Sequence, residues 1–134
     1  VDANGRSTAE RLLAATGTTT WIADEAQMDA VTALSGSGPA YVFLLAEAMI
    51  ASGVAEGLPH DAAQALALQT VLGAARMLVE SGEAPDELRK RVTSPNGTTQ
   101  AALDSFERDG FRAIVAHAIH AARVRGGELS AMND

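Results

Sequence analysis

The sequence predicts an all-α domain, and its composition and patterning support this class. Apolar residues make up 47% of the 134 residues but aromatic residues only 4%, so most apolar side chains are small and suit closely approaching helices. From residue 24 onward, apolar residues recur at helical spacing. The chain has no cysteine, which excludes disulfides, zinc thiolate sites and thiol nucleophiles. A chain of this length can bury one core.

The first 24 residues differ from the rest of the chain. Ser7 and Glu10 have the spacing of a capping box, which predicts a short helix from Ser7 to Ala15. Residues 18–22 are β-branched or aromatic and predict a strand. Because a lone strand leaves its backbone unpaired, residues 1–24 are interpreted as the remnant of a preceding domain, or as an arm that pairs with another chain.

Six further helices are expected. The helix over 39–52 is apolar on nearly every face, which predicts burial in a core or an interface. A membrane span needs about 20 apolar residues, and Glu47 and Gly53 interrupt this run, so burial in protein is favoured. Residues 36–39 interrupt the helices on either side, since Pro39 suits a first helical turn. The full set covers residues 26–35, 39–52, 59–81, 85–92, 98–108 and 111–126.

These helices need more apolar cover than one chain offers. The helix over 59–81 is rich in Ala and contains Gly73, and the chain has few bulky side chains to surround two long apolar helices. We therefore expect an intimate homodimer in which interlocked helices supply the missing layer. Glu47 would then need a partner, either Arg76 or a group across the interface.

The charge pattern excludes several kinds of partner. The net charge is −7, and this acidic balance argues against nucleic acid and against a membrane surface. No secretory signal is visible, so a cytoplasmic setting is expected. The chain begins at Val1 and is interpreted as a fragment. His117 and His120 lie three residues apart, but neither Cys nor a nearby acidic residue shares their face, so no metal site is expected.

The segment from Ser94 to Thr99 is the candidate binding site that the residues suggest, a turn able to hold an anion. Asn96 and Gly97 both tolerate positive φ, so the chain can form a tight concavity there. The amides of residues 97–99 would then point outward from a helix N-terminus, whose dipole favours a carboxylate or a phosphate. Hydroxyl groups add uncharged donors. An ordinary helix cap without a ligand remains the competing interpretation, because Ser-Pro and Asn-Gly are common in turns.

Three segments together resemble pyrroline-5-carboxylate reductase: residues 29–41, residues 57–59 and residues 92–99. Their order and spacing match the C-terminal half of that family over residues 6–130. The resemblance implies the all-α, C-terminal dimerisation domain of a 6-phosphogluconate-dehydrogenase-like reductase over residues 25–134. Residues 1–24 would be the last helix and strand of the N-terminal dinucleotide-binding domain.

The resemblance also implies an activity. Family members reduce the cyclic imine 1-pyrroline-5-carboxylate to L-proline by hydride transfer from NADPH or NADH, and dimers can assemble further into decamers. The missing N-terminal domain would bind the cofactor, so the fragment alone should be inactive. Two alternatives are a helical homodimerisation module with no catalytic site, and a related dehydrogenase domain that acts on a different carboxylate.

The resemblance assigns roles within residues 94–99. Thr99 would orient the ring nitrogen as the catalytic residue, and residues 36–41 would shape the floor near the nicotinamide. Asn96 stands where the family usually has glycine, which puts the fit of the substrate in question. Ser94, Gly97, Thr98 and Thr99 would hold the substrate carboxylate. The full set of expected substrate-binding residues is Ser94, Asn96, Gly97, Thr98 and Thr99.

Overall fold

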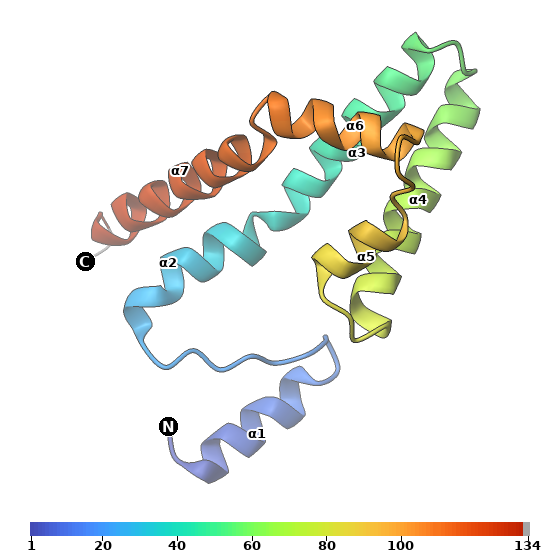
Figure 1. Ribbon diagram of the computed structural model, residues 1–134. Coiled ribbons are helices and arrows are strands. Elements are labelled where there is room, and N and C mark those ends of the chain that lie inside the picture. Colours follow the sequence, from blue (N-terminus) through green and yellow to red (C-terminus); the bar gives the residue numbers. More distant parts are fainter. Residues whose placement is uncertain (133–134) are drawn as a thin grey trace.

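The computed structural model describes residues 1–132, and those residues form helices without any strand. The predicted all-α class is therefore confirmed (Figure 1). A 3₁₀ turn (η1) and a π-helix (η2) flank the short second helix, and the remaining elements are α-helices. In chain order they are α1 (Ala3–Leu13), η1 (Glu25–Gln27), α2 (Met28–Val31), η2 (Thr32–Gly36), α3 (Gly38–Ala55), α4 (His60–Glu80), α5 (Pro85–Arg91), α6 (Thr98–Arg108) and α7 (Phe111–Ala131).

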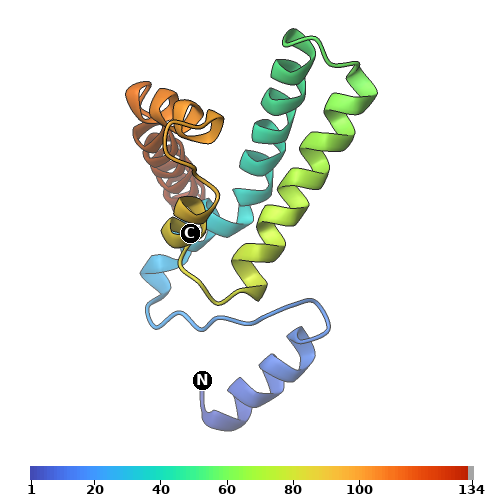
Figure 2. The ribbon, with the colours of Figure 1, turned by 45° about the vertical axis from the view of Figure 1, so that its right-hand side comes forward.

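The N-terminal segment corrects two predictions. Residues 18–22 form no strand, because no other segment of the described chain offers them a pairing edge. The capping box at Ser7 is also wrong: α1 begins four residues earlier, where the Asp2 carboxylate accepts a hydrogen bond from the Gly5 amide at 2.7 Å. The Trp21 indole donates to Glu10 at 2.5 Å. This contact ties the irregular segment to α1, which otherwise lies apart from the other helices (Figure 2).

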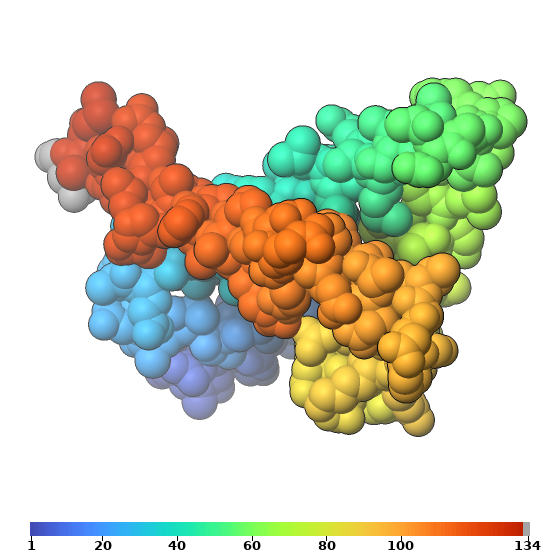
Figure 3. Space-filling model, turned by 45° about the horizontal axis from the view of Figure 1, so that its top comes forward, coloured from blue at the N-terminus to red at the C-terminus, as the bar shows by residue number. Residues whose placement is uncertain are grey.

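Two helix pairings organise the rest of the chain. The antiparallel helices α3 and α4 form a hairpin in which Gly53 faces Ala63. Helix α7 runs back along α2 and η2, and the Asp29 carboxylate lies against the backbone of its glycine pair, Gly126 and Gly127. Figure 3 shows the α3–α4 hairpin and the α7 arm spreading apart from the middle of the molecule. The result is an open V rather than a closed bundle.

The buried core is very small. Among the described residues the buried apolar side chains are four alanines and one leucine, at positions 33, 46, 63, 67 and 88. Helix α3 was expected to be buried in a core or an interface, yet Phe43 and Leu44 are 64% and 66% exposed. Burial within the chain is therefore ruled out for this helix, and its burial in an interface stays a prediction.

Element boundaries agree closely for the long helices. Helix α6 has the predicted bounds, whereas α7 continues to Ala131, five residues beyond the predicted end. The helices on either side of residues 36–39 were expected to be interrupted there. The structure shows only a small interruption: the π-helix η2 ends at Gly36 and α3 begins at Gly38, with Ser37 between them. By length and composition, the segments Glu25–Ala55 and His60–Glu80 could each cross a membrane. The core helices of other proteins are also long and apolar enough to meet this criterion. Length and composition therefore do not show whether lipid or protein covers these two segments.

Candidate anion-binding site

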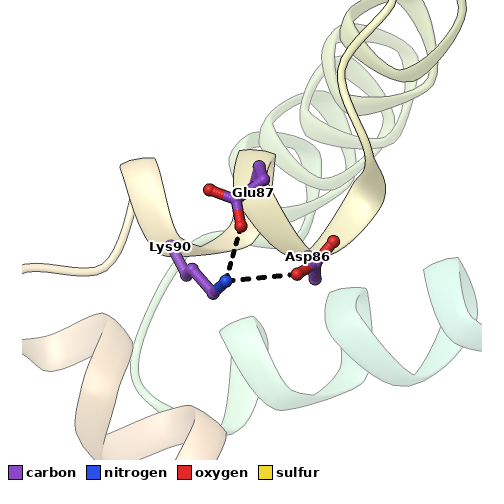
Figure 4. Close-up of polar contacts among 3 residues, drawn as sticks. All are labelled: Asp86, Glu87 and Lys90. Atoms are coloured by element: carbon purple, nitrogen blue, oxygen red, sulfur yellow. Dashed lines mark hydrogen bonds and ion pairs between the residues drawn. The ribbon is translucent and has the colours of Figure 1, made fainter.

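Helix α5 directly precedes the candidate site in the chain. Its Leu88 side chain is buried, and its Lys90 ammonium bridges Asp86 at 3.2 Å and Glu87 at 2.5 Å (Figure 4). The hydrogen bond and charge of Lys90 hold the pKa of the Asp86 carboxyl below its ordinary value. Hydrogen bonds from Lys90 to Glu87 and Asp86 raise the pKa of Lys90 in return. This exposed ion cluster lies on α5, whereas Leu88 of the same helix is buried.

A tight turn follows α5. The Gly97 amide donates to the Ser94 carbonyl at 3.0 Å, with Pro95 and Asn96 at the two central positions. Asn96 has φ of 59°, and a proline followed by a residue of positive φ is the pattern of a type II turn. The predicted positive φ at Asn96 is therefore confirmed.

Gly97 does not use the positive φ that a glycine tolerates. Its φ is −86°, so Asn96 alone supplies the positive φ of the turn. Glycine is favoured here for another reason: a Cβ at this position would lie 3.1 Å from the Ser94 carbonyl oxygen and 3.3 Å from the Ser94 Cβ, which is a tight contact. The close approach closes the turn and sets the direction in which α6 begins.

The free amides of the site belong to the first turn of α6. The Gly97 amide is already used within the turn, and the first hydrogen bond of the helix joins the Ala101 amide to the Gly97 carbonyl at 3.1 Å. The backbone amides of Thr98, Thr99 and Gln100 thus donate to no other described residue, although the Gln100 side chain donates to Asp104 at 2.6 Å. The expected trio of 97–99 is corrected to 98–100. Sequence reasoning missed Gln100, although the rule that a helix starts with unpaired amides could have identified it.

The side chains around these amides add donors without charge. The hydroxyl groups of Ser94, Thr98 and Thr99 have no hydrogen-bond partner among the described residues, and neither has the Asn96 amide group. Thr99 is half-buried, whereas Ser94 and Thr98 are exposed. No acidic residue occupies the first turn of α6. Free amides, free hydroxyls and the positive end of the helix dipole can together bind a carboxylate.

Residues 36–41 lie elsewhere in the chain. The Ser37 amide donates to the Thr32 carbonyl at 2.8 Å, and the Tyr41 hydroxyl donates to the Ala33 carbonyl at 2.9 Å. No Cα of α6 comes within 8 Å of one in η2 or α3. One copy of the chain therefore does not bring these helices together around the turn. The described residues also contain no strand followed by a glycine loop and a helix, so they do not fit a dinucleotide site.

Two hollows adjoin α6. One, of about 210 Å³, lies between the end of α5 and α6. The larger, of about 670 Å³, is mostly apolar and opens between α3, α6 and α7, where Leu45, Leu103 and Phe111 contribute to its wall. Arg89 lines both hollows, and its guanidinium makes no ion pair with the described residues. Apart from its place in the short basic run Arg89-Lys90-Arg91, nothing in the sequence pattern singles out Arg89.

Comparison with known proteins gives a consistent set of relatives. The family model described as pyrroline-5-carboxylate reductase dimerisation matches residues 25–129. A pyrroline-5-carboxylate reductase of Pseudomonas aeruginosa is 56% identical over 122 residues, which cover 91% of this chain and 45% of that protein. The reductase of Pisum sativum is 53% identical over 110 residues, which cover 82% of this chain and 40% of that protein.

Solved structures agree with these sequence relatives. A pyrroline-5-carboxylate reductase from Coxiella burnetii superposes with a TM-score of 0.93 at 42% identity, covering 96% of this chain and 48% of that one. The pyrroline carboxylate reductase of Plasmodium falciparum, solved with NADP bound, gives a TM-score of 0.82 at 33% identity, covering 94% and 48%. The chain thus spans less than half the length of these relatives.

Proposed function

Because this chain belongs to the pyrroline-5-carboxylate reductase family, we propose that it is the substrate-binding and dimerising part of a reductase that converts 1-pyrroline-5-carboxylate to L-proline. Residues 25–134 would be the helical domain and residues 1–24 the end of the preceding nucleotide domain, with the last two residues outside the described structure. Membership rests on the family match over residues 25–129 and on the identity of the relatives.

The free first turn of α6 carries this proposal. The amides of Thr98, Thr99 and Gln100 would receive the substrate carboxylate, and the neighbouring hydroxyls of Ser94 and Thr98 would complete its hydrogen bonds. Such a site holds an anion without placing a cation beside the electrophilic imine. Binding at a fixed helix end also limits how the ring can rotate, which is the positioning that the reaction needs.

Thr99 would make the contact closest to the reacting atoms. Its half-buried hydroxyl has no partner among the described residues, so it is free to orient the ring nitrogen of the imine. NADPH or NADH would supply the hydride when bound by the preceding part of the full-length protein. The chain without that part would be inactive, and the full-length enzyme would act in the cytoplasm as a homodimer or as decamers built from such dimers.

The test compares variants in the full-length protein. Thr99→Ala should lower turnover with pyrroline-5-carboxylate strongly, by about 100-fold if the hydroxyl acts at the reacting nitrogen, and Thr99→Ser should recover much of the loss. Ser105→Ala is the matched control, since Ser105 lies further along α6 and its hydroxyl bonds only to the side chains of Arg108 and Asp109. Near-normal turnover of Thr99→Ala would remove the catalytic role from Thr99.

A second measurement separates this function from the alternative of a dimerisation module without a site. Titration of the full-length protein with L-proline, followed by amide NMR, should shift the resonances of residues 98–100 before those of α7. If proline leaves these amides unchanged at saturating cofactor, the turn is only a helix cap.

A further inference from the structure

The side chain of Asn96 is free, and the residue after it is glycine. Asn96 is exposed, and no described residue bonds to its side-chain amide. Gly97 has no Cβ that would hinder an approach to that amide from the backbone. Asparagine is one of the residues that age chemically, and an asparagine that precedes a glycine loses its amide most readily. The turn therefore places a reactive pair directly before α6.

The loss of this amide needs only these two residues and water. The Gly97 amide nitrogen loses its proton and bonds to the side-chain carbonyl carbon of Asn96. The bond from that carbon to the side-chain nitrogen breaks, which releases ammonia. Water then opens the five-membered imide at either of its two carbonyl carbons, which leaves aspartate or isoaspartate at position 96. One water is consumed for each ammonia released, and no oxidant or reductant takes part.

The fold holds this reaction back through a single hydrogen bond. The reacting nitrogen can reach the side chain only if the backbone rotates, and the bond from the Gly97 amide to the Ser94 carbonyl at 3.0 Å opposes that rotation. The amides of residues 98–100 are free, so the turn can open while the hydrogen bonds of α6 stay intact. Local opening of this kind takes much less free energy than global unfolding.

The same pair of residues occurs at a second place in the chain. Asn4 and Gly5 lie in the first turn of α1, so rotation there must unwind the start of a helix. The Gly5 amide also donates to the Asp2 carboxylate at 2.7 Å. That negative charge opposes loss of the amide proton, whereas the Gly97 amide faces a neutral carbonyl. The pair in the turn should therefore react faster than the pair in α1.

A carboxylate at position 96 would lie next to the proposed substrate site. In the unmodified chain no acidic residue occupies the first turn of α6. The free amides and the helix dipole attract a nearby anion, so the new carboxylate would compete with the substrate for them. Its charge would also repel the substrate carboxylate. Isoaspartate further lengthens the main chain by one atom, which displaces the Gly97 amide from the Ser94 carbonyl.

We propose that Asn96 is the main deamidation site of the described chain, and that its conversion to a carboxylate weakens the binding of the substrate at the start of α6. The second half of this proposal rests on the proposed function, whereas the first half does not. The neutral side chain at 96 thus limits how long the protein keeps its full affinity for an anionic substrate.

The first test follows the conversion in the full-length protein during incubation at physiological temperature. Trypsin releases residues 92–108 as one peptide, because only the last of them is basic. Fragmentation of this peptide locates the change from amide to acid at Asn96 and not at Gln100. Conversion at 96 should be faster than at Asn4 by about fivefold or more, and an isoaspartyl methyltransferase should label the product. Conversion at 96 that is absent, or no faster than at Asn4, overturns the proposal.

The second test measures the effect on the substrate. Anion exchange separates the converted protein by its added negative charge, and its KM for pyrroline-5-carboxylate should be about tenfold higher than that of the unconverted protein, with a smaller change in kcat. Asn96→Asp should reproduce this rise without ageing. Asn4→Asp is the matched control, because it adds the same charge in α1, and its KM should stay at the wild-type value.

The outcomes separate this proposal from the proposed function. An unchanged KM in both the converted protein and Asn96→Asp overturns the inhibitory role of the carboxylate. Asn96→Gly should keep its own starting KM during the incubation, and an equal rise in that variant overturns the assignment to Asn96. Unconverted protein whose amides at 98–100 do not respond to L-proline overturns the proposed substrate site, whatever happens at Asn96.

Discussion

Asn96 is the only described residue other than glycine with a positive φ, and it sits where the chain turns from α5 into α6. An ordinary L-residue in this conformation costs about 1 kcal/mol or more, while asparagine tolerates it and glycine is free of it. The turn depends on this angle, since it brings the Gly97 amide to the Ser94 carbonyl. The side chain at 96 therefore acts through backbone preference.

Two truncations of the Asn96 side chain should therefore differ in their effect on stability. Asn96→Ala should lower the free energy of unfolding by about 1 kcal/mol, because alanine does not favour positive φ. Asn96→Gly should leave stability within about 0.5 kcal/mol, because relief of the backbone conformation offsets the added entropy of the unfolded chain. Urea unfolding measures both. Equal losses would show that the asparagine amide itself stabilises the turn.

At this scale the sequence predicts what is local. The positive φ of Asn96 and the start of α6 at Thr98 depend on neighbouring residues only, and both are found in the structure. The role of Gly97 could not be predicted in the same way, because the close approach to the Ser94 carbonyl oxygen, 3.1 Å from an added Cβ, favours glycine there and not a positive φ. A close contact and a positive φ both favour glycine, so a glycine in the sequence does not reveal which of the two reasons applies.

At the scale of elements, helix α2 approaches helix α7 through the Asp29 side chain. The Asp29 carboxylate occupies the space that side chains at Gly126 and Gly127 would fill. Alanine favours a helix over glycine by about 1 kcal/mol, but at Gly126 the added methyl must displace the carboxylate. The two effects oppose each other.

A double-mutant cycle separates them. Gly126→Ala alone should stabilise the protein by clearly less than about 1 kcal/mol, whereas the same change in an Asp29→Ala background should recover the full helix preference. Chemical unfolding of the four variants gives the coupling energy. Additive effects would mean that the carboxylate moves aside freely and does not hold the helices apart.

The ion cluster of α5 predicts a dependence on pH. The lowered pKa of Asp86 means that its contribution is present above its ordinary value of 3.8 and is lost as the pH falls through the lowered pKa. The raised pKa of Lys90 means that its contribution is present below 10.5 and is lost as the pH rises through the raised pKa. Between those limits the cluster is complete.

Lys90→Met should therefore reduce stability most between these two pH limits, and the difference from wild type should shrink in acid and in alkali. Urea midpoints across the pH range measure this, with Arg89→Met as the control because Arg89 has no ion pair among the described residues. A loss that stays constant into acid would show that Lys90 acts through packing of its stem and not through Asp86.

Helices with strong end signals could be predicted at the level of elements. Helix α5 begins at Pro85 and α4 ends before Gly82, which has φ of 70°, as a helix stop requires. The strand over residues 18–22 could not be predicted correctly, because a strand exists only through its pairing partner. Its composition favours extended structure, but its described neighbour is helix α1, which Trp21 contacts through Glu10, and a helix offers no strand edge for pairing.

At the scale of the whole molecule, the burial of apolar side chains was the property least predictable from the sequence. The apolar character of α3 and α4 is plain in the sequence, but the sequence does not say which surface covers these helices, and the described chain leaves much of them exposed. The described chain has a core of four alanines and one leucine. So few buried side chains offset only a small part of the conformational entropy of some 130 ordered residues, and we therefore expect the fold to need further cover.

Stability should therefore depend on concentration. If folding and association occur together, each tenfold increase in protein concentration should add about 1.4 kcal/mol to the free energy of unfolding per dimer. Urea unfolding at two concentrations tests this through the shift of the midpoint. Both runs should be made without detergent, because a protein that takes its cover from lipid would unfold or aggregate in its absence whatever its concentration. An unchanged midpoint would mean that one copy is stable alone, and the exposed apolar side chains of α4 would then need an explanation other than a partner subunit.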